Sequence, residues 1–395
     1  MQLIRCLSIL HIIPDLSRSS GGPVEVVMNL VKAMGSFGHQ MVIGATDYNF
    51  FQSGIPIDVR HLILGRCDIV RWRWSWNLKR KLVPAIRQAD IVHIHGLWEY
   101  PVWMGAKICV QLRRPYVLSP CGMLDPWSMT QKKWRKKIYM ILAGQQIISR
   151  AASIHFTSKQ EKARSLPAMG HVMKSFICPL GVDNALFEHV PETQVFRERF
   201  PSIGDDKVIL FLGRIHYKKQ PELLIRAFKL VLSKYPNSHL IIAGPGNATY
   251  VDSLKRLSFE LQIGSKVLFT GMLTGDSKKE TLSAADIYVL PSLQENFGIA
   301  VAEAMSVGCP VVISDAVNLA EDVMAFHTGI VCQNTSEAFA DAILKLLMNE
   351  RLRREMGENG RKMAKEKYDW SKTAQTLISK YREMLTCLNH CWPNY

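Results

Sequence analysis

Long apolar runs are missing from this sequence of 395 residues: no segment approaches the ~18 consecutive apolar residues that a membrane-spanning helix needs. Paired cysteines are missing too, since the nine cysteines are scattered from Cys6 to Cys391 without a C-x-x-C motif. This scatter argues against a zinc site and favours a reduced, cytosolic location, in which most cysteines are small buried hydrophobes. No internal repeat of short period and no low-complexity tract appears, so an ordinary globular chain is expected.

Acidic residues are scarce relative to basic ones. The chain has 34 Asp and Glu against 49 Lys and Arg, which gives a net charge of +15 and a pI near 9.4. Such a surface favours polyanionic partners, which include nucleic acid, anionic lipid headgroups and phosphorylated ligands. Composition does not choose among these three.

Short apolar runs alternate with helical patterns along almost the whole chain, and its length favours two domains of roughly 170–200 residues. The clearest helix is Pro221–Tyr235, with proline at its first position and one apolar face. The first apolar run carries Arg5 and His11, and we interpret it as a buried strand rather than a secretory signal. Buried strands alternating with crossover helices predict parallel sheets covered on both faces. The expected strands are Leu3–Ile13, Gln40–Ala45, Ile91–His95, Tyr116–Ser119, Ile154–Thr157, Lys207–Leu212, Ser238–Ala243, Lys266–Thr270, Ile287–Leu290 and Pro310–Ser314.

The alternation breaks once, between Cys178 and Asp206, where proline and glycine gather among polar residues without a period. We therefore expect a first domain of residues 1–183, a linker of residues 184–205 and a second domain of residues 206–369. A helix expected at residues 370–388 should pack back on the first domain. The predicted fold class is α/β, with two doubly wound domains facing each other across a cleft. In such sheets, ligands bind beyond the carboxyl ends of the strands.

The strongest motif is PSLQENFGIAVAEAM at residues 291–305. Glu295 lies on the loop after a buried strand, and Glu303 lies about a turn and a half into the small-residue helix that follows. Between these carboxylates, the backbone amides of residues 296–298 form a helix N-terminus, which attracts anions. The arrangement suits a ligand with hydroxyls at both ends and phosphates between them. The alternative for Glu303 alone is that it only complements the helix dipole.

This motif resembles the paired-glutamate signature of family 4 glycosyltransferases, which are retaining enzymes of the GT-B fold with two Rossmann-like domains. The resemblance covers nearly the whole chain. It implies that Glu303 accepts hydrogen bonds from the ribose hydroxyls of a nucleotide-sugar and that Glu295 binds a hydroxyl of the transferred sugar. The amides around Asn296, Phe297 and Gly298 would touch the sugar or the phosphate.

A second match to the family is FLGRIHYKK at residues 211–219, a strand end with Arg214 followed by Lys219. The family holds the donor diphosphate at these two positions, which suits the fork of an arginine and the point charge of a lysine. Without the resemblance, Arg214 and Lys219 would be interpreted as two solvated cations at the end of a strand. Lys218 is expected to be a solvated cation of this kind. The resemblance thus makes Arg214, Lys219 and Glu295 the catalytic set.

Several loops match the family more weakly. The loop with Met272 and Leu273 stands where the family reads the base, and residues 244–246, Gly-Pro-Gly, let the chain pass close to the nucleotide. Gly21 and Gly22 precede an expected helix over residues 24–35 and permit close approach to a donor phosphate. By itself, such a glycine pair is a plain turn.

The first domain also departs from the family pattern. Many members carry a sugar-contacting histidine in the loop after the strand Tyr116–Ser119, but here Cys121 takes the position. His93 should point into the fold or the cleft wall, and His95 is the candidate for a polar side chain that lines the cleft. The alternative for His95 is a satisfied structural histidine. His95 and Cys121 are therefore the candidates for contacts with the acceptor or the transferred sugar.

The resemblance implies retaining transfer from a UDP- or GDP-sugar to a hydroxyl of a saccharide or lipid-linked saccharide, in polysaccharide or glycolipid assembly. No Asp-x-Asp occurs, which favours a metal-free grip on the diphosphate, and no cofactor is expected. A non-catalytic sugar-nucleotide-binding protein stays an alternative. So does a basic nucleic-acid-binding protein, although it leaves the glutamates unexplained, and nucleic acid is not the expected partner. An epimerase or a phosphorylase lacks a sequence signal.

Two segments of the first half, residues 71–81 and 127–150, combine tryptophan with clustered positive charge. Indole rings settle at the level of lipid headgroups, and each Lys or Arg near an anionic surface contributes about 1 kcal/mol. This predicts a cytoplasmic protein with a peripheral face at the inner membrane leaflet, near a lipid-linked acceptor. The alternative is that both segments are solvated helix faces with their tryptophans in the core.

Overall fold

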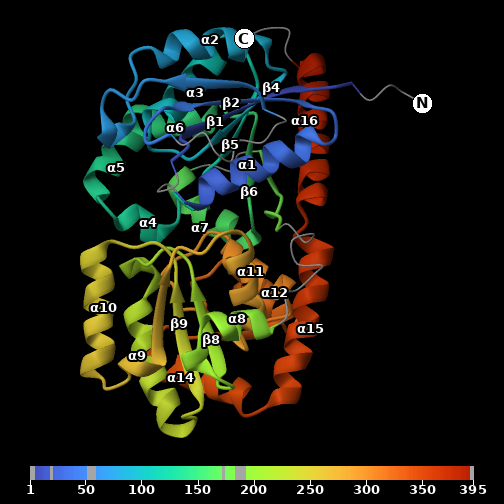
Figure 1. Cartoon of the computed structure of the whole chain (residues 1–395). Helices are drawn as coiled ribbons and strands as arrows, with labels where there is room; N and C mark the ends of the chain where they lie inside the picture. Colours follow the sequence, from blue (N-terminus) through green and yellow to red (C-terminus); the bar gives the residue numbers. More distant parts are fainter. Residues whose placement is uncertain (1–4, 18–20, 51–58, 171–173, 183–192, 392–395) are drawn as a thin grey trace. The chain divides into compact units, whose positions relative to one another are not determined.

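The computed structural model describes residues 5–17, 21–50, 59–170, 174–182 and 193–391. Its contacts divide the chain into two units (Figure 1). Unit 1 comprises Met1–Leu180 with Trp370–Tyr395, and unit 2 comprises Gly181–Asp369. Each unit holds its own parallel sheet with helices packed on it, so the predicted α/β class with two doubly wound sheets is confirmed.

The sheet of unit 1 has the strand order β3-β2-β1-β4-β5-β6-β7, and all its pairs are parallel. α1 and α16 pack together on one face, and α2 and α3 share a core with the other face (Figure 1). The strands are β1 (Ser8–Asp15), β2 (Gln40–Thr46), β3 (Val59–Gly65), β4 (Ile91–His95), β5 (Tyr116–Ser119), β6 (Ser153–Phe156) and β7 (Ser175–Ile177). The helices are α1 (Gly22–Gly35), η2 (Val70–Trp72), α2 (Leu78–Gln88), α3 (Tyr100–Gln111), α4 (Pro126–Thr130), α5 (Lys133–Tyr139), η3 (Met140–Gly144), α6 (Gln145–Ser149), α7 (Lys159–Met169) and α16 (Trp370–Cys391).

The sheet of unit 2 has the strand order β10-β9-β8-β11-β12-β13, again all parallel. Its strands are β8 (Lys207–Leu212), β9 (Ser238–Ala243), β10 (Val267–Gly271), β11 (Ile287–Leu290), β12 (Val311–Ser314) and β13 (Gly329–Cys332). Its helices are α8 (Thr193–Arg199), η5 (Pro201–Ile203), η6 (Tyr217–Lys219), α9 (Pro221–Lys234), α10 (Ala248–Glu260), η7 (Gly264–Lys266), α11 (Gly275–Ala284), α12 (Ile299–Ser306), α13 (Ala320–Ala325), α14 (Ser336–Leu347) and α15 (Glu350–Lys367).

Each sheet has one point where the chain reverses its direction of travel across the strands, between β1 and β4 in unit 1 and between β8 and β11 in unit 2. At such a switch point the following loops diverge and leave a crevice at the carboxyl edge, where ligands of doubly wound sheets bind. The loops after β1 and β4, and those after β8 and β11, contain most of the site residues expected from the sequence.

The structure confirms every expected strand to within a few residues at its ends, but three strands were not expected. These are β3, β7 and β13, and each lies at an edge of its sheet. Their side chains are mostly half-buried or exposed, so they lack the continuous apolar runs by which the central strands were recognised. The first expected strand begins at Ser8 rather than Leu3, although residues 1–4 lie outside the described part.

The segment expected as a linker, residues 184–205, is described from residue 193 onward. There it forms α8 and η5, which belong to unit 2. The C-terminal helix α16 belongs to unit 1 and lies beside α1 (Figure 1).

A buried chain of hydrogen bonds ties α16 to the sheet of unit 1. The Tyr381 hydroxyl lies 2.6 Å from His93 Nδ1, and His93 Nε2 lies 2.6 Å from Ser119 Oγ. The chain continues from Ser119 to His155 Nδ1 at 2.8 Å, and His155 Nε2 meets the carbonyl of Cys178. His93 therefore points into the fold, as expected, and its contact with Tyr381 links α16 to β4.

Candidate functional site

An ion pair stands at the switch point of unit 2. Lys219 Nζ, at the end of η6, lies 2.6 Å from Glu295 Oε2, on the loop after β11. Two features bring these distant residues together. The amide of Leu293 donates to the carbonyl of Lys218 at 2.8 Å, and the Lys219 side chain passes over Gly213, 3.3 Å from where a Cβ would stand. The structure thus joins two of the three residues of the expected catalytic set.

The electrostatics of Glu295 favour its ionised form. Burial alone would raise the pKa of this carboxyl, but the charges of Lys219, Lys218 and Arg214 and the hydrogen bond from Lys219 outweigh burial and lower the pKa. Arg214 itself is exposed and forms no hydrogen bond or ion pair with any described residue. A cationic cluster with one spare guanidinium is suited to bind a phosphate group.

The second expected glutamate is also paired. Glu303 lies in α12, is 7% exposed, and its Oε1 accepts a hydrogen bond from Lys278 Nζ on α11 at 2.6 Å. Alanines on α12 let this helix pack closely in the core, which buries the glutamate. Sequence reasoning missed Lys278, because a single lysine in a polar helix carries no signal of its own.

The turn between the two glutamates is built for close packing. Gly298 adopts a left-handed conformation (φ 79°) as the N-cap of α12, and the Phe297 ring is buried against Tyr368. The Phe297 ring is therefore not available to a ligand. The buried amides of Gln294 and Asn318 have polar atoms without a partner among the described residues, and the Asn318 backbone amide donates to the Glu295 carbonyl. An unsatisfied buried amide is costly, so both join the candidates that sequence reasoning missed.

The turn after β9 needs a glycine at position 244, because neighbouring backbone packs closely against it. A Cβ on Gly244 would stand 1.9 Å from the carbonyl oxygen of Gly213, so this position tolerates no side chain. The Gly244 amide donates to the Gly271 carbonyl at 2.7 Å, immediately before Met272 and Leu273. Met272 is exposed and Leu273 is half-buried, at the carboxyl edge of the same sheet. No contact among the described residues shows whether Met272 and Leu273 would touch a ligand.

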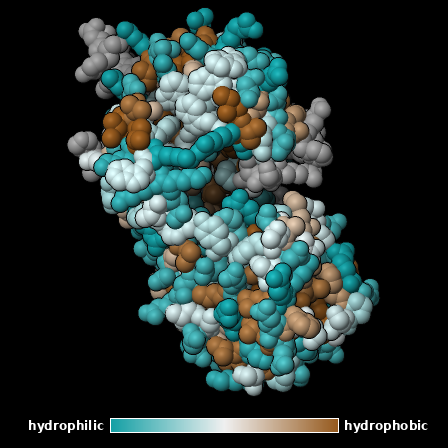
Figure 2. All heavy atoms as spheres, turned by 90° about the vertical axis from the view of Figure 1, so that its left-hand side faces the viewer, coloured by the Kyte–Doolittle hydropathy of each residue, from teal (hydrophilic) through white to brown (hydrophobic). Residues whose placement is uncertain are grey.

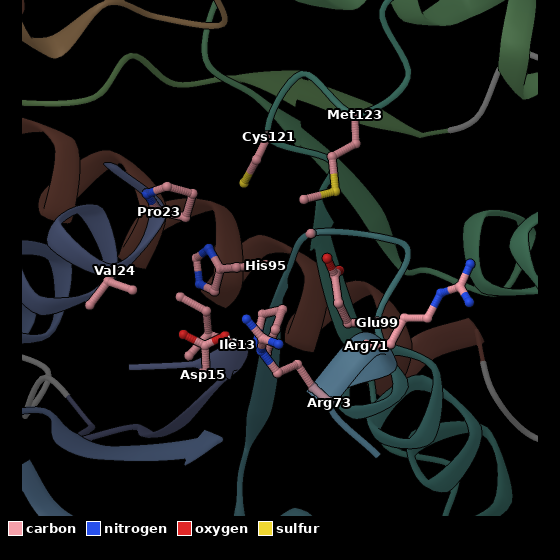
Figure 3. A pocket seen from close by; sticks show the side chains of 12 residues that line it. Ile13, Asp15, Pro23, Val24, Arg71, Arg73, His95, Glu99, Cys121 and Met123 are labelled. Carbon is pink, nitrogen blue, oxygen red and sulfur yellow. Dashed lines mark hydrogen bonds and ion pairs between the residues drawn. The ribbon is translucent and has the colours of Figure 1, made fainter. Parts of the chain in front are cut away.

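A cavity of about 230 Å³ lies at the switch point of unit 1. Figure 3 shows side chains from the ends of β1, β4 and β5, from the start of α1 and from η2 gathered around it. Gly21, the N-cap of α1 with φ 68°, and Gly22 are exposed and directly precede two of its lining residues. The cavity is lined by Ile13, Pro14, Asp15, Pro23, Val24, Arg71, Arg73, His95, Gly96, Glu99, Cys121 and Met123.

Two charged groups of this cavity hold each other. Asp15 Oδ2 lies 2.6 Å from Arg73 Nε, and Asp15 Oδ1 accepts hydrogen bonds from the amide and hydroxyl of Ser17. Arg73 is in the left-handed region (φ 53°), donates to the carbonyl of Val70, and stacks 3.6 Å from the centre of the Tyr48 ring. The guanidinium is therefore fixed in place.

His95 and Cys121, the two candidates of the first domain, both line this cavity. Burial lowers the pKa of His95 well below its usual value, and the nearby His11 and His155 add to the effect, so its ring is neutral. Its Nε2 lies 2.9 Å from His11 Nδ1. Burial, with Glu161 and Glu99 nearby, raises the pKa of the Cys121 thiol to about 12, which leaves Cys121 protonated and poorly suited to replace a histidine in acid–base chemistry.

The ring nitrogens of His11, His93 and His95 lie within 4.8 Å of one another, which is close enough for a shared metal ion. Both nitrogens of His93, however, already meet hydroxyl groups, and His11 and His95 are joined to each other. We therefore interpret these rings as buried hydrogen-bonding groups beside the cavity, which only His95 of the three lines.

The two tryptophan-rich segments differ. Trp72 and Trp74 pack inward against Tyr100, with ring centres 5.8 and 4.3 Å away, so the expectation that they face a membrane is wrong. In the second segment, α5 and η3 expose Trp134, Ile138, Ile141 and Leu142 beside several lysines. None of the helices in the described ranges is long and apolar enough to span a bilayer.

Comparisons with known families match both units. The family described as "Glycosyl transferases group 1" matches residues 192–363, and a "Glycosyl transferase 4-like domain" matches residues 21–174. A glycosyltransferase of Methanocaldococcus jannaschii that has no assigned reaction is 30% identical over 322 residues, 78% of either chain. A GDP-mannose-dependent alpha-(1-6)-phosphatidylinositol monomannoside mannosyltransferase of Mycolicibacterium smegmatis is 28% identical over 68% of this chain and 72% of its own.

Solved structures show the same architecture. HepE of Anabaena, in complex with UDP and glucose, has a TM-score of 0.80 at 18% identity and covers 95% of this chain and 100% of its own. Sucrose-phosphate synthase of Thermosynechococcus elongatus has a TM-score of 0.78 at 20% identity, with 96% and 100% covered. These similarities confirm the expected GT-B class with two Rossmann-like domains.

The lowered pKa of Glu295 predicts a pH-dependent contribution to stability. A carboxyl whose pKa is lower in the folded than in the unfolded chain stabilises the fold above its unfolded pKa, near 4.5, and loses this effect as pH falls through the folded value. Glu295→Gln should therefore lower the free energy of unfolding by roughly 1–3 kcal/mol at pH 7, since Lys219 loses its charged partner. The deficit should shrink below pH ~4.5.

Urea unfolding at a series of pH values measures this difference. Glu260→Gln on α10 is the matched control, because Glu260 is exposed and has no ion pair with a described residue. A deficit of the same size at pH 7 and pH 3 would contradict the assignment of an ionised, lysine-paired Glu295.

Proposed function

This chain belongs to the group 1 glycosyl transferases, and we propose that it transfers a sugar from a nucleoside-diphosphate sugar to an acceptor hydroxyl with retention of configuration. The observation that carries the proposal is the cluster of Lys219, Glu295 and the exposed Arg214 at the switch point of unit 2. A UDP complex of HepE and a GDP-mannose-dependent relative support UDP- or GDP-sugars as the donor class.

In this proposal each group at the edge of unit 2 has one task. Arg214 and Lys219 hold the diphosphate and stabilise the charge that grows on it as the bond from the sugar C1 to the phosphate oxygen breaks. Glu303 accepts hydrogen bonds from the ribose, and Glu295 positions the sugar through a hydroxyl. The acceptor oxygen bonds to C1 on the face that the diphosphate leaves, and its proton passes to the departing phosphate oxygen. Neither glutamate becomes bonded to the sugar.

Arg214→Ala should lower the turnover of the donor by roughly 10²–10³, which is typical for removal of one such stabilising group. Because Arg214 is exposed and has no partner among the described residues, the variant should fold like the wild type. Release of nucleoside diphosphate from UDP- and GDP-sugars measures the rate, and Arg226→Ala on the exposed face of α9 is the control. Wild-type turnover by Arg214→Ala would refute the diphosphate assignment, and no turnover by the wild type would favour a non-catalytic sugar-nucleotide-binding protein.

We also propose that this transfer needs no metal ion and no cofactor. The support is the absence of Asp-x-Asp from the sequence and the presence of the cations Lys219 and Arg214 at the edge of unit 2, which can neutralise a diphosphate themselves. Turnover should therefore persist at its full rate after exhaustive dialysis against a chelator. Loss of turnover that added Mg²⁺ or Mn²⁺ restores would contradict a metal-free grip.

A peripheral contact with an anionic membrane at the cytoplasmic face is part of the proposal. The exposed apolar side chains of α5 and η3 stand among Lys132, Lys133, Arg135 and Lys137, which are all exposed. Figure 2, which faces the side where α5 lies, shows apolar patches set among hydrophilic side chains on the part formed by unit 1. An apolar groove of about 280 Å³, walled in part by Met129 and Met140 and edged by Lys133 and Lys137, lies beside this helix. This charge and shape suit anionic lipid, and a lipid-linked saccharide as acceptor in polysaccharide or glycolipid assembly.

Trp134→Ala should weaken binding to anionic vesicles several-fold, because the ring is 74% exposed and would enter the headgroup layer. Trp76→Ala is the matched control, since Trp76 is equally exposed but lies in the other segment. Co-sedimentation with phosphatidylserine-containing and pure phosphatidylcholine vesicles, across a salt series, measures the effect. Equal binding of both variants, or no binding to anionic vesicles at low salt, would refute this surface.

A further inference from the structure

His216 stands within the cationic cluster of unit 2 and has no part in the diphosphate grip proposed above. It lies between Arg214 and Lys219 in the sequence and is the N-cap residue of η6. Its backbone is extended (φ −151°, ψ 146°), and the preceding Ile215 is buried and forms an isolated parallel bridge with Gly246. Because side chains alternate along extended backbone, His216 and Arg214 should both lie opposite the buried Ile215, on the same side of the segment.

Two contacts fix the His216 ring and its tautomer. The backbone amide of Lys218 donates to Nδ1 at 3.2 Å, so Nδ1 has no hydrogen of its own and the hydrogen of the neutral ring is on Nε2. The ring also packs against that of Tyr217, with the ring centres 4.3 Å apart. Nε2 forms no hydrogen bond with any described residue, and the side chain is half-buried. An oriented N–H donor is therefore left over in the cluster.

The surroundings keep this ring neutral at pH 7. Partial burial lowers the pKa of His216 below its usual value, and the positive charges of its neighbours lower this pKa further. These neighbours are Arg214, Lys218 and Lys219, whereas the acidic group of the cluster, Glu295, is paired with Lys219. Protonation would also place a hydrogen on Nδ1 and break the hydrogen bond from the Lys218 amide.

A neutral donor among three cations favours a ligand with anionic oxygens. Such an oxygen accepts a hydrogen bond from an imidazole N–H as it does from a guanidinium, and the bond is stronger than one between neutral groups. The charges of Arg214 and Lys219 attract the anion, whereas the imidazole orients it and adds no charge that would retain it after the transfer. This combination suits a diphosphate that must be held in one orientation and then leave.

We propose that His216 is a third ligand of the donor diphosphate, a neutral imidazole that donates from Nε2 to a phosphate oxygen beside Arg214 and Lys219. The assignment rests on the transferase function proposed above and adds a residue to its diphosphate site. His216 is a binding residue here, since it takes up no proton in the transfer. The amide of Lys218 holds the ring in the donating tautomer.

Two substitutions separate the Nε2 donor from the cap of η6. His216→Asn keeps an acceptor near the position of Nδ1, as asparagine does at many helix N-caps, but removes the Nε2 donor. His216→Gln places its side-chain amide near the position of Nε2 and gives up the cap. In calorimetric titrations of UDP and GDP into the full-length chain at pH 7, His216→Asn should weaken the nucleotide that the wild type binds by about tenfold. His216→Gln should weaken it less.

His327→Asn is the matched control and should leave nucleotide affinity unchanged. His327 is exposed and precedes β13, so it lies at the amino edge of the sheet, opposite the carboxyl edge that holds the cluster.

The tautomer gives a second readout, which a capping role alone would not move. Nitrogen NMR of histidine-labelled protein, with the His216 signals assigned by their loss in either variant, should show a proton on Nε2 and none on Nδ1. The Nε2 proton should shift when the nucleotide binds, and Nδ1 should stay unprotonated in the complex. Should His216→Asn fail to fold, this shift in the wild type still decides the question, because an unmoved Nε2 signal would overturn the assignment.

The assignment is also overturned if His216→Asn binds the nucleotide as tightly as the wild type, if His216→Gln loses more affinity than His216→Asn, or if Nδ1 is protonated in the complex. Each of these results leaves the transferase proposal in place, since the nucleotide still binds. If neither UDP nor GDP binds the wild type, the transferase proposal fails and the assignment of His216 fails with it.

Discussion

A carboxylate that leaves water must find a cation or a hydrogen-bond donor, and both candidate sites are organised by this requirement. In unit 2, Glu295 and Glu303 each lie 2.6 Å from a lysine, so their negative charge is held at the edge of the sheet at little cost. Arg214 is left over, exposed and available to an anion. In unit 1, by contrast, one carboxyl oxygen of Glu99 has no hydrogen-bond partner in the described structure. One site thus offers a cation to its ligand, and the other offers an acceptor.

The topology of the parallel sheets makes these pairings possible. Lys219 and Glu295 are 76 positions apart in the sequence and meet because β8 and β11 are neighbours at the switch point of their sheet. Their loops are joined through Leu293 and Lys218, and the turn after β9 can approach only because Gly244 has no side chain. The same arrangement around β1 and β4 of unit 1 gathers Asp15, His95 and Glu99 around one cavity. Two sheets of like order therefore produce two sites of different charge.

Much of this was predictable from the sequence, for physical reasons. Central strands such as β4 and β8 are buried on both faces and read as continuous apolar runs, whereas the edge strands β3, β7 and β13 do not. The paired glutamates and the strand-end cations were found because their spacing matches a family motif. Lys278 and Glu99 carry no such signal, since their importance arises only from what packs against them. A segment that combines tryptophan with positive charge does not reveal whether the indole ring packs into the core, as that of Trp74 does, or is exposed, as that of Trp134 is.

The account rests on a division of labour between the two glutamates of unit 2, in which Glu303 holds the nucleotide and Glu295 holds the sugar. Calorimetric titration of UDP and GDP into the wild type, Glu303→Gln and Glu295→Gln tests this division directly. The account predicts that one nucleotide binds the wild type, that Glu303→Gln weakens it by about tenfold or more, and that Glu295→Gln leaves its affinity within about twofold. Equal losses of nucleotide affinity in the two variants would contradict it.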